Sequence, residues 1–144
     1  MGVVKSKRNE SKIEFEMLFF ELANDIDVMV EHFFFANAQV LADNRTFIAY
    51  RSAALERCVD DLLLHIKIAN SIYPQCLAEW EERRIEIGKA IGTCYTILTH
   101  YQRVMLRLKV KDGKYATDVM TIQHMINSLK AWRKSDNKFK SNLK

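Results

Sequence analysis

Apolar residues recur along the first quarter of the chain at alternating spacings of four and three residues. This spacing places them on one face of an α-helix. Ser11 is a suitable N-cap, and Glu14 and Glu16 follow it near the positive end of the helix dipole. We therefore expect a helix from Ser11 towards Val40, and the pattern leaves open whether residues 12–43 form one helix or two. The spaced positions are Phe15, Phe19, Leu22, Ile26, Met29, Phe33, Ala36 and Val40.

Three further runs of the same spacing follow, each bounded by residues that end helices or form turns. Asp43-Asn44 precedes the second run, Tyr73-Pro74 ends it, and Lys111-Asp112-Gly113 separates the third from the fourth. Proline disfavours the α conformation of the residue before it, and Lys-Asp-Gly is typical of a turn. Thr117 or Asp118 is the expected cap of the fourth helix. The three faces comprise Ile48, Ser52, Leu55, Val59, Leu62, Ile66, Ala69 and Tyr73; Leu77, Trp80, Arg84, Ile87, Ile91, Cys94, Leu98, Tyr101, Met105 and Leu108; and Val119, Ile122, Met125, Ile126, Leu129 and Trp132.

Four amphipathic helices with short connections predict an all-α fold, an up-and-down antiparallel four-helix bundle. We assign residues 1–144 to one domain of this kind, with residues 1–10 and 136–144 as basic, mobile tails. The chain has only 4 Gly and 1 Pro, which fits long helices better than a sheet-rich or disordered chain. Gly88 and Gly92 interrupt the third helix, and close approach of a neighbouring helix would explain them.

Charge is distributed unevenly along the chain. Residues 13–43 contain seven acidic residues and no Lys or Arg, whereas five basic residues stand against Asp112 in residues 103–114, and six against Asp136 in residues 130–144. An antiparallel bundle would place these two basic segments at opposite ends. Clustered lysines and arginines bind nucleic-acid phosphates through counterion release, without reading the bases. The alternative is that these cations are merely solvated. The acidic first helix, in turn, would suit a basic patch of a second copy of the chain.

The sequence lacks the signals of a secreted or membrane protein. The N-terminal segment has no apolar core of a signal peptide, and no stretch of about 18 uncharged apolar residues occurs. Cys58, Cys76 and Cys94 cannot all pair and have no Cys-x-x-Cys spacing, which fits a reducing compartment. We therefore expect a cytoplasmic protein that does not bind membranes.

No pattern of catalytic or metal-binding residues is complete. No histidine follows a glutamate by three residues, as di-metal helical bundles require, and none follows an arginine by four to six residues, as in one class of helical ribonuclease. Asp61 and His65 are one turn apart, and a surface pair explains them better than a metal site. Cys94 lies on the core face, so we expect an inert thiol. We expect no enzymatic activity, no metal and no cofactor.

From about Arg51 to the C-terminus the chain resembles the accessory variability determinant (Avd) proteins of diversity-generating retroelements. These share a four-helix superfamily with proteins encoded in intervening sequences of ribosomal RNA genes. The likeness lies in ALERCVDDLLLHIKIANSI, EERRIEIGKAIGTCYTILTHYQRVM and INSLKAWRKS, whose ending resembles the family's closing Trp followed by basic residues. The acidic first helix and the missing Phe-Pro turn after it depart from the family pattern. The Ser-Ile-Pro and Asn-Ile-Ala-Glu-Gly motifs of the intervening-sequence branch are absent, which favours the Avd branch.

The resemblance implies a non-catalytic homopentamer of four-helix bundles. Such a protein binds the retroelement's reverse transcriptase and its template or spacer RNA, with DNA as a further candidate, and supports mutagenic cDNA synthesis. The alternative is a helical protein–protein adaptor without nucleic-acid function. Basic surface residues carry the binding in this family, and here the expected ones are Arg83, Arg84, Lys89, Arg103, Arg107, Lys109, Lys111, Arg133 and Lys134.

Overall fold

The computed structural model describes residues 5–34, 38–111 and 113–143, with side chains for residues 15–32, 38–111 and 113–143. This part of the chain contains helices and no strand. The helices are α1 (Lys5–Phe34), α2 (Ala38–Asp43), α3 (Arg45–Ser71), α4 (Leu77–Arg107), α5 (Ala116–Ser135) and α6 (Asn137–Lys140).

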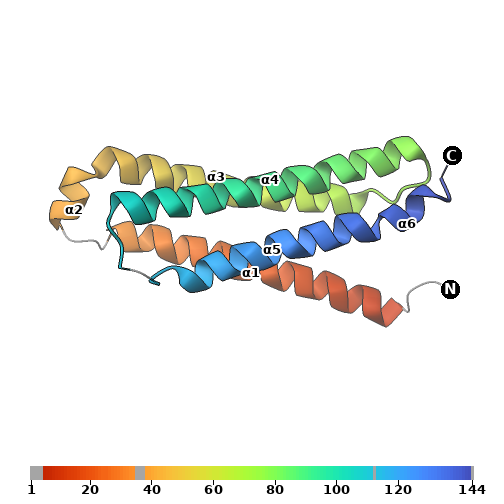
Figure 1. Cartoon of the computed structure of the whole chain (residues 1–144), viewed down its shortest axis with the longest axis horizontal. Helices are drawn as coiled ribbons and strands as arrows, with labels where there is room; N and C mark the ends of the chain where they lie inside the picture. Colours follow the sequence, from red (N-terminus) through yellow and green to blue (C-terminus); the bar gives the residue numbers. More distant parts are fainter. Residues whose placement is uncertain (1–4, 35–37, 112, 144) are drawn as a thin grey trace.

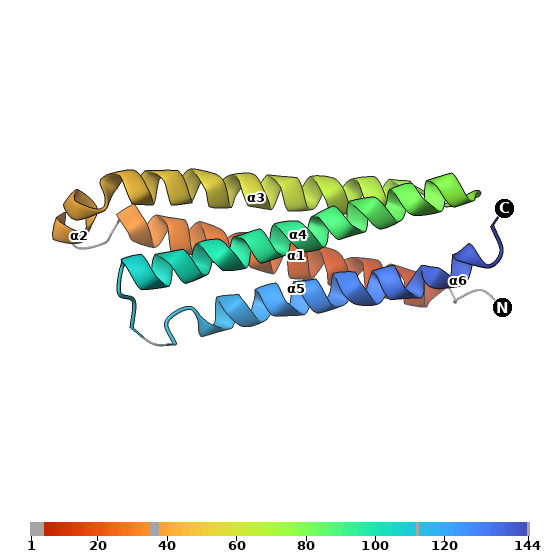
Figure 2. The same cartoon turned by 45° about the horizontal axis from the view of Figure 1, so that its top comes forward.

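The four long helices α1, α3, α4 and α5 pack side by side as a bundle. α3 contacts both α1 and α4, and α5 contacts both α4 and α1, so each long helix has two neighbours. Figures 1 and 2 show that the chain runs up and down the bundle. Both termini lie at one end, and the α4–α5 connection lies at the other end together with α2. The predicted all-α bundle is confirmed.

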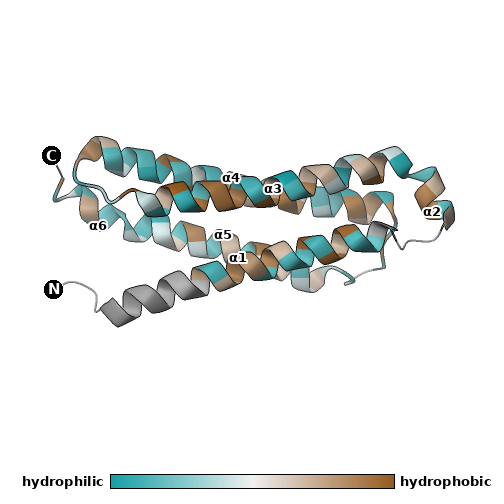
Figure 3. Ribbon diagram, turned by 180° about the vertical axis from the view of Figure 1, so that it is seen from behind, coloured by the Kyte–Doolittle hydropathy of each residue, from teal (hydrophilic) through white to brown (hydrophobic). Residues whose placement is uncertain are grey.

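Side chains from all four long helices form one apolar core. In Figure 3 apolar and polar segments alternate along the helices, as expected for helices with one buried face. Complete burial of one such side chain contributes about 1.5–3 kcal/mol, so this core is the main source of stability. The largest fully buried side chains of the described residues are Leu22, Ile26, Met29, Leu55, Leu62, Ile87, Ile97, Tyr101, Ile122, Met125, Ile126 and Leu129.

The predicted boundaries of the last three long helices agree closely with the structure. α3 ends at Ser71, and Pro74 lies in the irregular connection that precedes Leu77, the first residue of α4. α5 begins at Ala116 and ends at Ser135. Its N-cap is Tyr115, so the expected cap at Thr117 or Asp118 was wrong, and both residues lie in the first turn of the helix. Proline and turn residues mark all of these ends in the sequence.

The first helix differs from its prediction at both ends. It begins at Lys5, ahead of the expected cap at Ser11, and it ends at Phe34. The separate helix α2 follows, so residues 12–43 contain two helices. The expected core position Ala36 and the side chain of Phe33 lie outside the described residues.

The buried face of α3 contains an arginine that the predicted face does not include. Arg51 is only 8% exposed, whereas Ser52, the predicted member, is half-buried. Arg84, predicted on the apolar face of α4, is exposed.

The two glycines of α4 also differ from expectation, because a Cβ added at Gly88 or Gly92 would meet no described atom within 4 Å. Close helix approach within this chain therefore does not explain them.

The C-terminal segment continues the bundle instead of leaving it at Ser135. The short helix α6 contacts α4 and α5, and Phe139 within it is half-buried. Asp136, between α5 and α6, is 4% exposed. This segment was expected to be a tail because its lysines suggest solvation; the structure packs its backbone against the start of α4.

Candidate nucleic-acid interface

α4 and α5 run antiparallel, and two contacts fix which of their ends meet. The Tyr101 hydroxyl donates to Asp118 Oδ2 at 2.9 Å, which joins the end of α4 to the start of α5. The Trp80 indole N–H donates to the Asp136 carbonyl at 2.9 Å, which joins the start of α4 to the end of α5. Cations therefore gather at both ends of the bundle. We call these clusters the loop pole (Arg45, Arg103, Arg107, Lys109, Lys111 and Lys114) and the terminal pole (Arg83, Arg84, Arg133, Lys134, Lys138 and Lys140).

The cations of the loop pole are exposed, and none forms an ion pair with another described residue. The ion pairs of the described residues lie elsewhere, on Glu86 and Asp136. Arg103, Lys109 and Lys111 make no hydrogen bond through their side chains within the described part. Because no described carboxylate pairs with them, their charges remain available to a phosphate backbone.

The backbone after α4 adopts an unusual conformation at Lys109. Lys109 adopts a left-handed conformation with φ 49°, and the Val110 N–H donates to the Met105 carbonyl at 3.2 Å. This bond closes the helix C-terminus in the manner of a Schellman motif, where glycine is usual after the cap. A non-glycine residue there costs about 1–2 kcal/mol. A charged residue thus occupies a position where local stability favours glycine.

Arg107 connects the loop pole to the start of α3. Its Nε–H donates to Asn44 Oδ1 at 3.0 Å, and its guanidinium lies 5.9 Å from the centre of the Phe47 ring. Arg107 remains exposed, so these contacts orient the side chain without removing its charge from solvent.

Arg51 of α3 and His100 of α4 contact each other near this pole, and sequence reasoning selected neither. Arg51 Nη1 lies 2.8 Å from His100 Nδ1, and the guanidinium stacks 4.8 Å from the Tyr50 ring centre and 5.4 Å from that of Phe47. Desolvation, followed by repulsion from Arg51 and Arg103, lowers the pKa of His100. The sequence does contain a signal for Arg51, because Ile48, Arg51, Leu55, Cys58 and Leu62 also alternate by three and four residues.

At the terminal pole, Arg83 is mainly a structural residue. Its Nη1 donates to the Ile72 carbonyl at 3.0 Å, and its Nε lies 2.8 Å from Asp136 Oδ2 as an ion pair whose alignment is poor for a hydrogen bond. The guanidinium also lies 5.1 Å from the Trp132 ring centre. Desolvation raises the pKa of Asp136, and the charge of Arg83 opposes that rise. Arg83 therefore holds the end of α3 and the end of α5 against α4.

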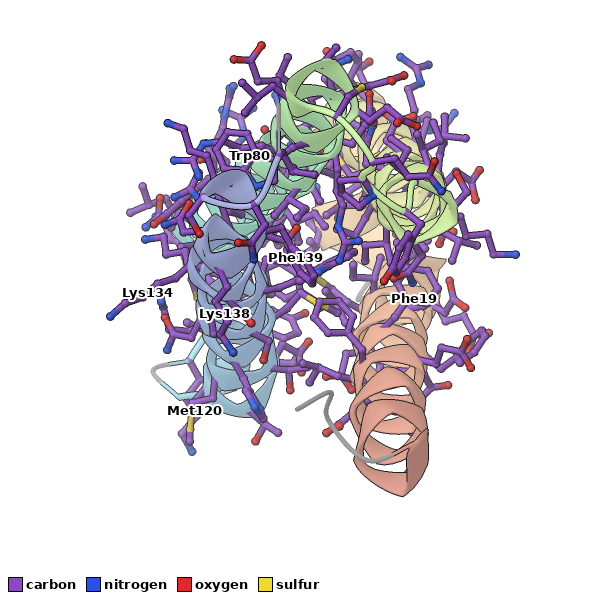
Figure 4. All side chains as sticks on the ribbon, turned by 90° about the vertical axis from the view of Figure 1, so that its right-hand side faces the viewer. Phe19, Trp80, Met120, Lys134, Lys138 and Phe139 are labelled. Carbon is purple, nitrogen blue, oxygen red and sulfur yellow. The ribbon has the colours of Figure 1, made fainter. Side chains whose placement is uncertain are left out.

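Two more cations at the terminal pole contact Trp80. Arg84 and Lys140 lie 5.4 and 5.2 Å from its ring centre, and Arg84 also donates to Asn137 Oδ1 at 3.3 Å. Figure 4, viewed along the bundle from this end, shows Trp80 beside α6 and Lys134 extending outwards from α5. Lys134 is exposed and Arg133 is half-buried. Neighbouring Glu79, Glu81 and Glu82 make this end less uniformly positive.

Lys89 lies between the poles and is partly neutralised by Glu86. The two charged atoms are 3.2 Å apart, and Glu86 also pairs with His65 Nδ1 at 2.7 Å. Desolvation opposes ionisation of Glu86, but its bonds to His65 and Lys89 outweigh that effect and lower its pKa. His65 therefore pairs with a residue of α4, not with Asp61 on its own helix.

The remaining titratable groups give no catalytic arrangement that we recognise in the described residues. Cys94 is fully buried, and desolvation followed by the neighbouring Cys58 raises the pKa of its thiol to about 12. A recess of about 190 Å³ between α1 and the start of α5 is lined by residues that include Asp25, His32 and Asp118. Desolvation is the largest cause that raises the pKa of both aspartates.

No group of three or more His, Cys, Asp and Glu side chains of the described residues is arranged to hold a metal ion. None of the described helices has the length and apolar character needed to cross a bilayer.

Comparison of the chain with protein-family models, with curated proteins and with solved structures gives no match. The structure brings Arg103, Arg107, Lys109 and Lys111 together at the loop pole, and Arg83, Arg84, Arg133 and Lys134 at the opposite end.

Proposed function

We propose that the protein is a cytoplasmic, non-catalytic accessory protein of a diversity-generating retroelement. In this role it binds the template or spacer RNA through phosphate contacts and binds the reverse transcriptase as a homopentamer. The RNA-binding part is supported by one observation above all: the exposed cations of the loop pole have no carboxylate partner among the described residues. The reverse transcriptase and the pentamer rest on the sequence resemblance.

The loop pole is the better candidate for the RNA contact. Its cations remain exposed, whereas Arg83 at the terminal pole is engaged with Asp136 and Ile72. Each phosphate contact with a single strand contributes about −0.7 to the slope of log K against log salt. With about four contacts, we expect a slope of about −3.

The test is fluorescence anisotropy of a labelled single-stranded RNA at several salt concentrations. Arg107→Gln/Lys111→Gln removes two charges from the loop pole, and Arg133→Gln/Lys134→Gln removes two from the terminal pole. Arg57→Gln/Lys67→Gln on α3 is the matched control, since it changes the net charge equally. We expect the loop-pole variant to lose about 1.4 units of salt slope, and the control almost none.

Two results would contradict the proposal. Absence of salt-dependent RNA binding by the unmodified protein would leave the helical adaptor as the better explanation. Equal losses in all three variants would mean that net charge alone attracts the RNA. Co-purification with the retroelement's reverse transcriptase tests the second partner separately, with the same variants.

A further inference from the structure

Arg51 of α3 is a buried cation. The residue is more than nine-tenths buried, no described carboxylate pairs with it, and its Nε has no hydrogen-bond partner. Burying a charged group without a counter-ion is costly, and proteins rarely retain one unless something compensates it. Its visible compensation is the rings of Phe47 and Tyr50 and one bond to His100.

The bond between Arg51 and His100 determines the state of the imidazole. A guanidinium can only donate, so Nδ1 of His100 must accept at 2.8 Å. The ring is then neutral and carries its proton on Nε2. Desolvation and the charges of Arg51 on α3 and Arg103 on α4 also favour the neutral ring, because they lower the pKa of His100. Arg51 thus keeps the proton on Nε2, which is then a hydrogen-bond donor.

That donor is unused in the described part of the chain. Nε2 of His100 makes no hydrogen bond there, and the residue is only half-buried. Arg103 and Arg107 lie three and seven residues further along α4, on the same side of the helix. Both are exposed, and neither has an acidic partner among the described residues.

We infer that Arg51, His100 and Arg103 form a phosphate-binding site on the seam between α3 and α4. Nε2–H of His100 and the guanidinium of Arg103 bind the phosphate oxygens. Arg51 is a positioning residue: it fixes the tautomer of His100 and supplies positive charge from behind. A phosphate bound there also places a negative charge near Arg51, which has no carboxylate partner among the described residues.

The phosphate that we assign to this site belongs to the RNA backbone, so the inference rests on the proposed function. It adds a defined site to the diffuse charge of the loop pole. A free phosphate ion presents the same oxygens, so inorganic phosphate serves as a probe of the site itself. Binding of RNA then tests whether the phosphate at this site belongs to an RNA backbone.

The first experiment is a histidine-detected NMR titration of the full chain with inorganic phosphate against chloride at equal ionic strength. We expect the unliganded protein to hold His100 as the Nε2–H tautomer, and phosphate to shift His100 while the exposed His124 of α5 stays in place. Arg51→Gln should release the tautomer preference and weaken the response of His100 to phosphate, whereas a purely structural arginine would leave that response unchanged. Equal shifts at His100 and His124, or an Nδ1–H tautomer, would overturn the site.

The second experiment measures RNA affinity of Arg103→Gln, with Arg57→Gln on α3 as the matched control. Arg103 is exposed, so its replacement should leave folding intact even if Arg51→Gln is unstable. One lost contact reduces the salt slope by about 0.7, which corresponds to about fivefold weaker binding at 0.1 M salt. If RNA binds but Arg103→Gln weakens it no more than the control does, the RNA assignment is wrong while the proposed function stands. If RNA does not bind at all, the proposed function fails, and the phosphate titration still decides the site.

Discussion

At the scale of single residues, carboxylates near the α1–α3 interface determine how stability responds to pH. Glu56 of α3 lies near Asp27 of α1 and near Asp60. The pKa of Glu56 is raised to about 7, chiefly by desolvation. A hydrogen bond and repulsion involving Asp27, and repulsion from Asp60, add to this rise. The folded protein therefore holds a proton on Glu56 over a pH range in which the unfolded chain, with a pKa near 4.5, has lost it.

The sign of the effect follows from this difference. The contribution of Glu56 is fully present below about pH 4.5 and is lost as the pH rises through about 7. Because Glu56 is exposed, solvent screens much of the repulsion, and the loss is smaller than the pKa alone implies. Glu56 by itself favours a higher melting temperature at pH 6 than at pH 8, whereas His100, whose pKa is lowered in the folded protein, favours pH 8. By circular dichroism we expect Glu56→Gln to raise the melting temperature more at pH 8 than at pH 6.

Glu81→Gln is the control for this prediction. It also removes one exposed carboxylate, but from α4, where it makes no described contact. If both variants change the pH dependence equally, overall charge is responsible and the cluster around Glu56 is not.

At the scale of helices, the two glycines of α4 lower stability without a compensating contact in the described chain. Gly in a helix interior costs about 0.8–1.0 kcal/mol relative to Ala. An added methyl group at Gly88 or Gly92 would enter open space. We expect Gly88→Ala and Gly92→Ala each to raise the free energy of unfolding by about 0.5–1 kcal/mol in urea titrations.

Gly113→Ala provides the opposite control. Its neighbourhood is equally open, but its φ is 84°, which L-residues rarely adopt. This substitution should destabilise the protein by about 1–2 kcal/mol. A loss of stability on Gly88→Ala or Gly92→Ala would show that a second chain or a partner approaches α4 closely at that glycine.

The helices also show which parts of the fold the sequence predicts. Pro74 and the turn around Gly113 mark the end of α3, both ends of α4 and the start of α5, so those boundaries could be read directly. No glycine or proline marks the break after Phe34, and the apolar spacing continues through it.

The burial of Arg51 was missed for a related reason. A face through Ser52 and a face through Arg51 share Ile48, Leu55 and other positions, and spacing alone cannot choose between them.

The candidate site was less predictable than the fold. Clusters of charge near helix ends identify the loop pole from sequence, because antiparallel packing brings the end of α4 to the start of α5. The partners of each cation depend on the register between helices. Arg83 pairs with Asp136, 53 residues away, and His100 pairs with Arg51, 49 residues away, and no local pattern contains either distance.

At the scale of the whole molecule, the exposed side of α1 is suited to contact a second copy of the chain. Its exposed side includes Met17 and Phe20, which are 65% and 62% exposed, together with the acidic Glu16, Glu21 and Glu31. Exposed apolar side chains beside acidic ones are suited to a surface of mixed apolar and basic character. The loop pole has such a surface, since Leu106, the most exposed large apolar residue described, lies between Arg103 and Arg107 on α4.

A ring of identical chains requires two different surfaces that fit each other head to tail. The proposed pentamer therefore predicts contact between α1 of one copy and the basic end of the next. By light scattering we expect a mass of about 85 kDa, five copies of the 16.9 kDa chain. Met17→Gln/Phe20→Gln should reduce it towards one copy without lowering the melting temperature, because neither side chain belongs to the core.

Leu64→Gln/Ile85→Gln is the matched control, since it replaces two exposed apolar residues on α3 and α4. It should leave the mass unchanged. A monomeric unmodified protein would remove the pentamer from the proposal but leave RNA binding by the loop pole to its own test. If instead the control dissociates the assembly and the α1 variant does not, the copies meet through α3 and α4. The open face over Gly88 and Gly92 would then be the first place to look for the contact, because glycines leave a helix surface accessible to another backbone.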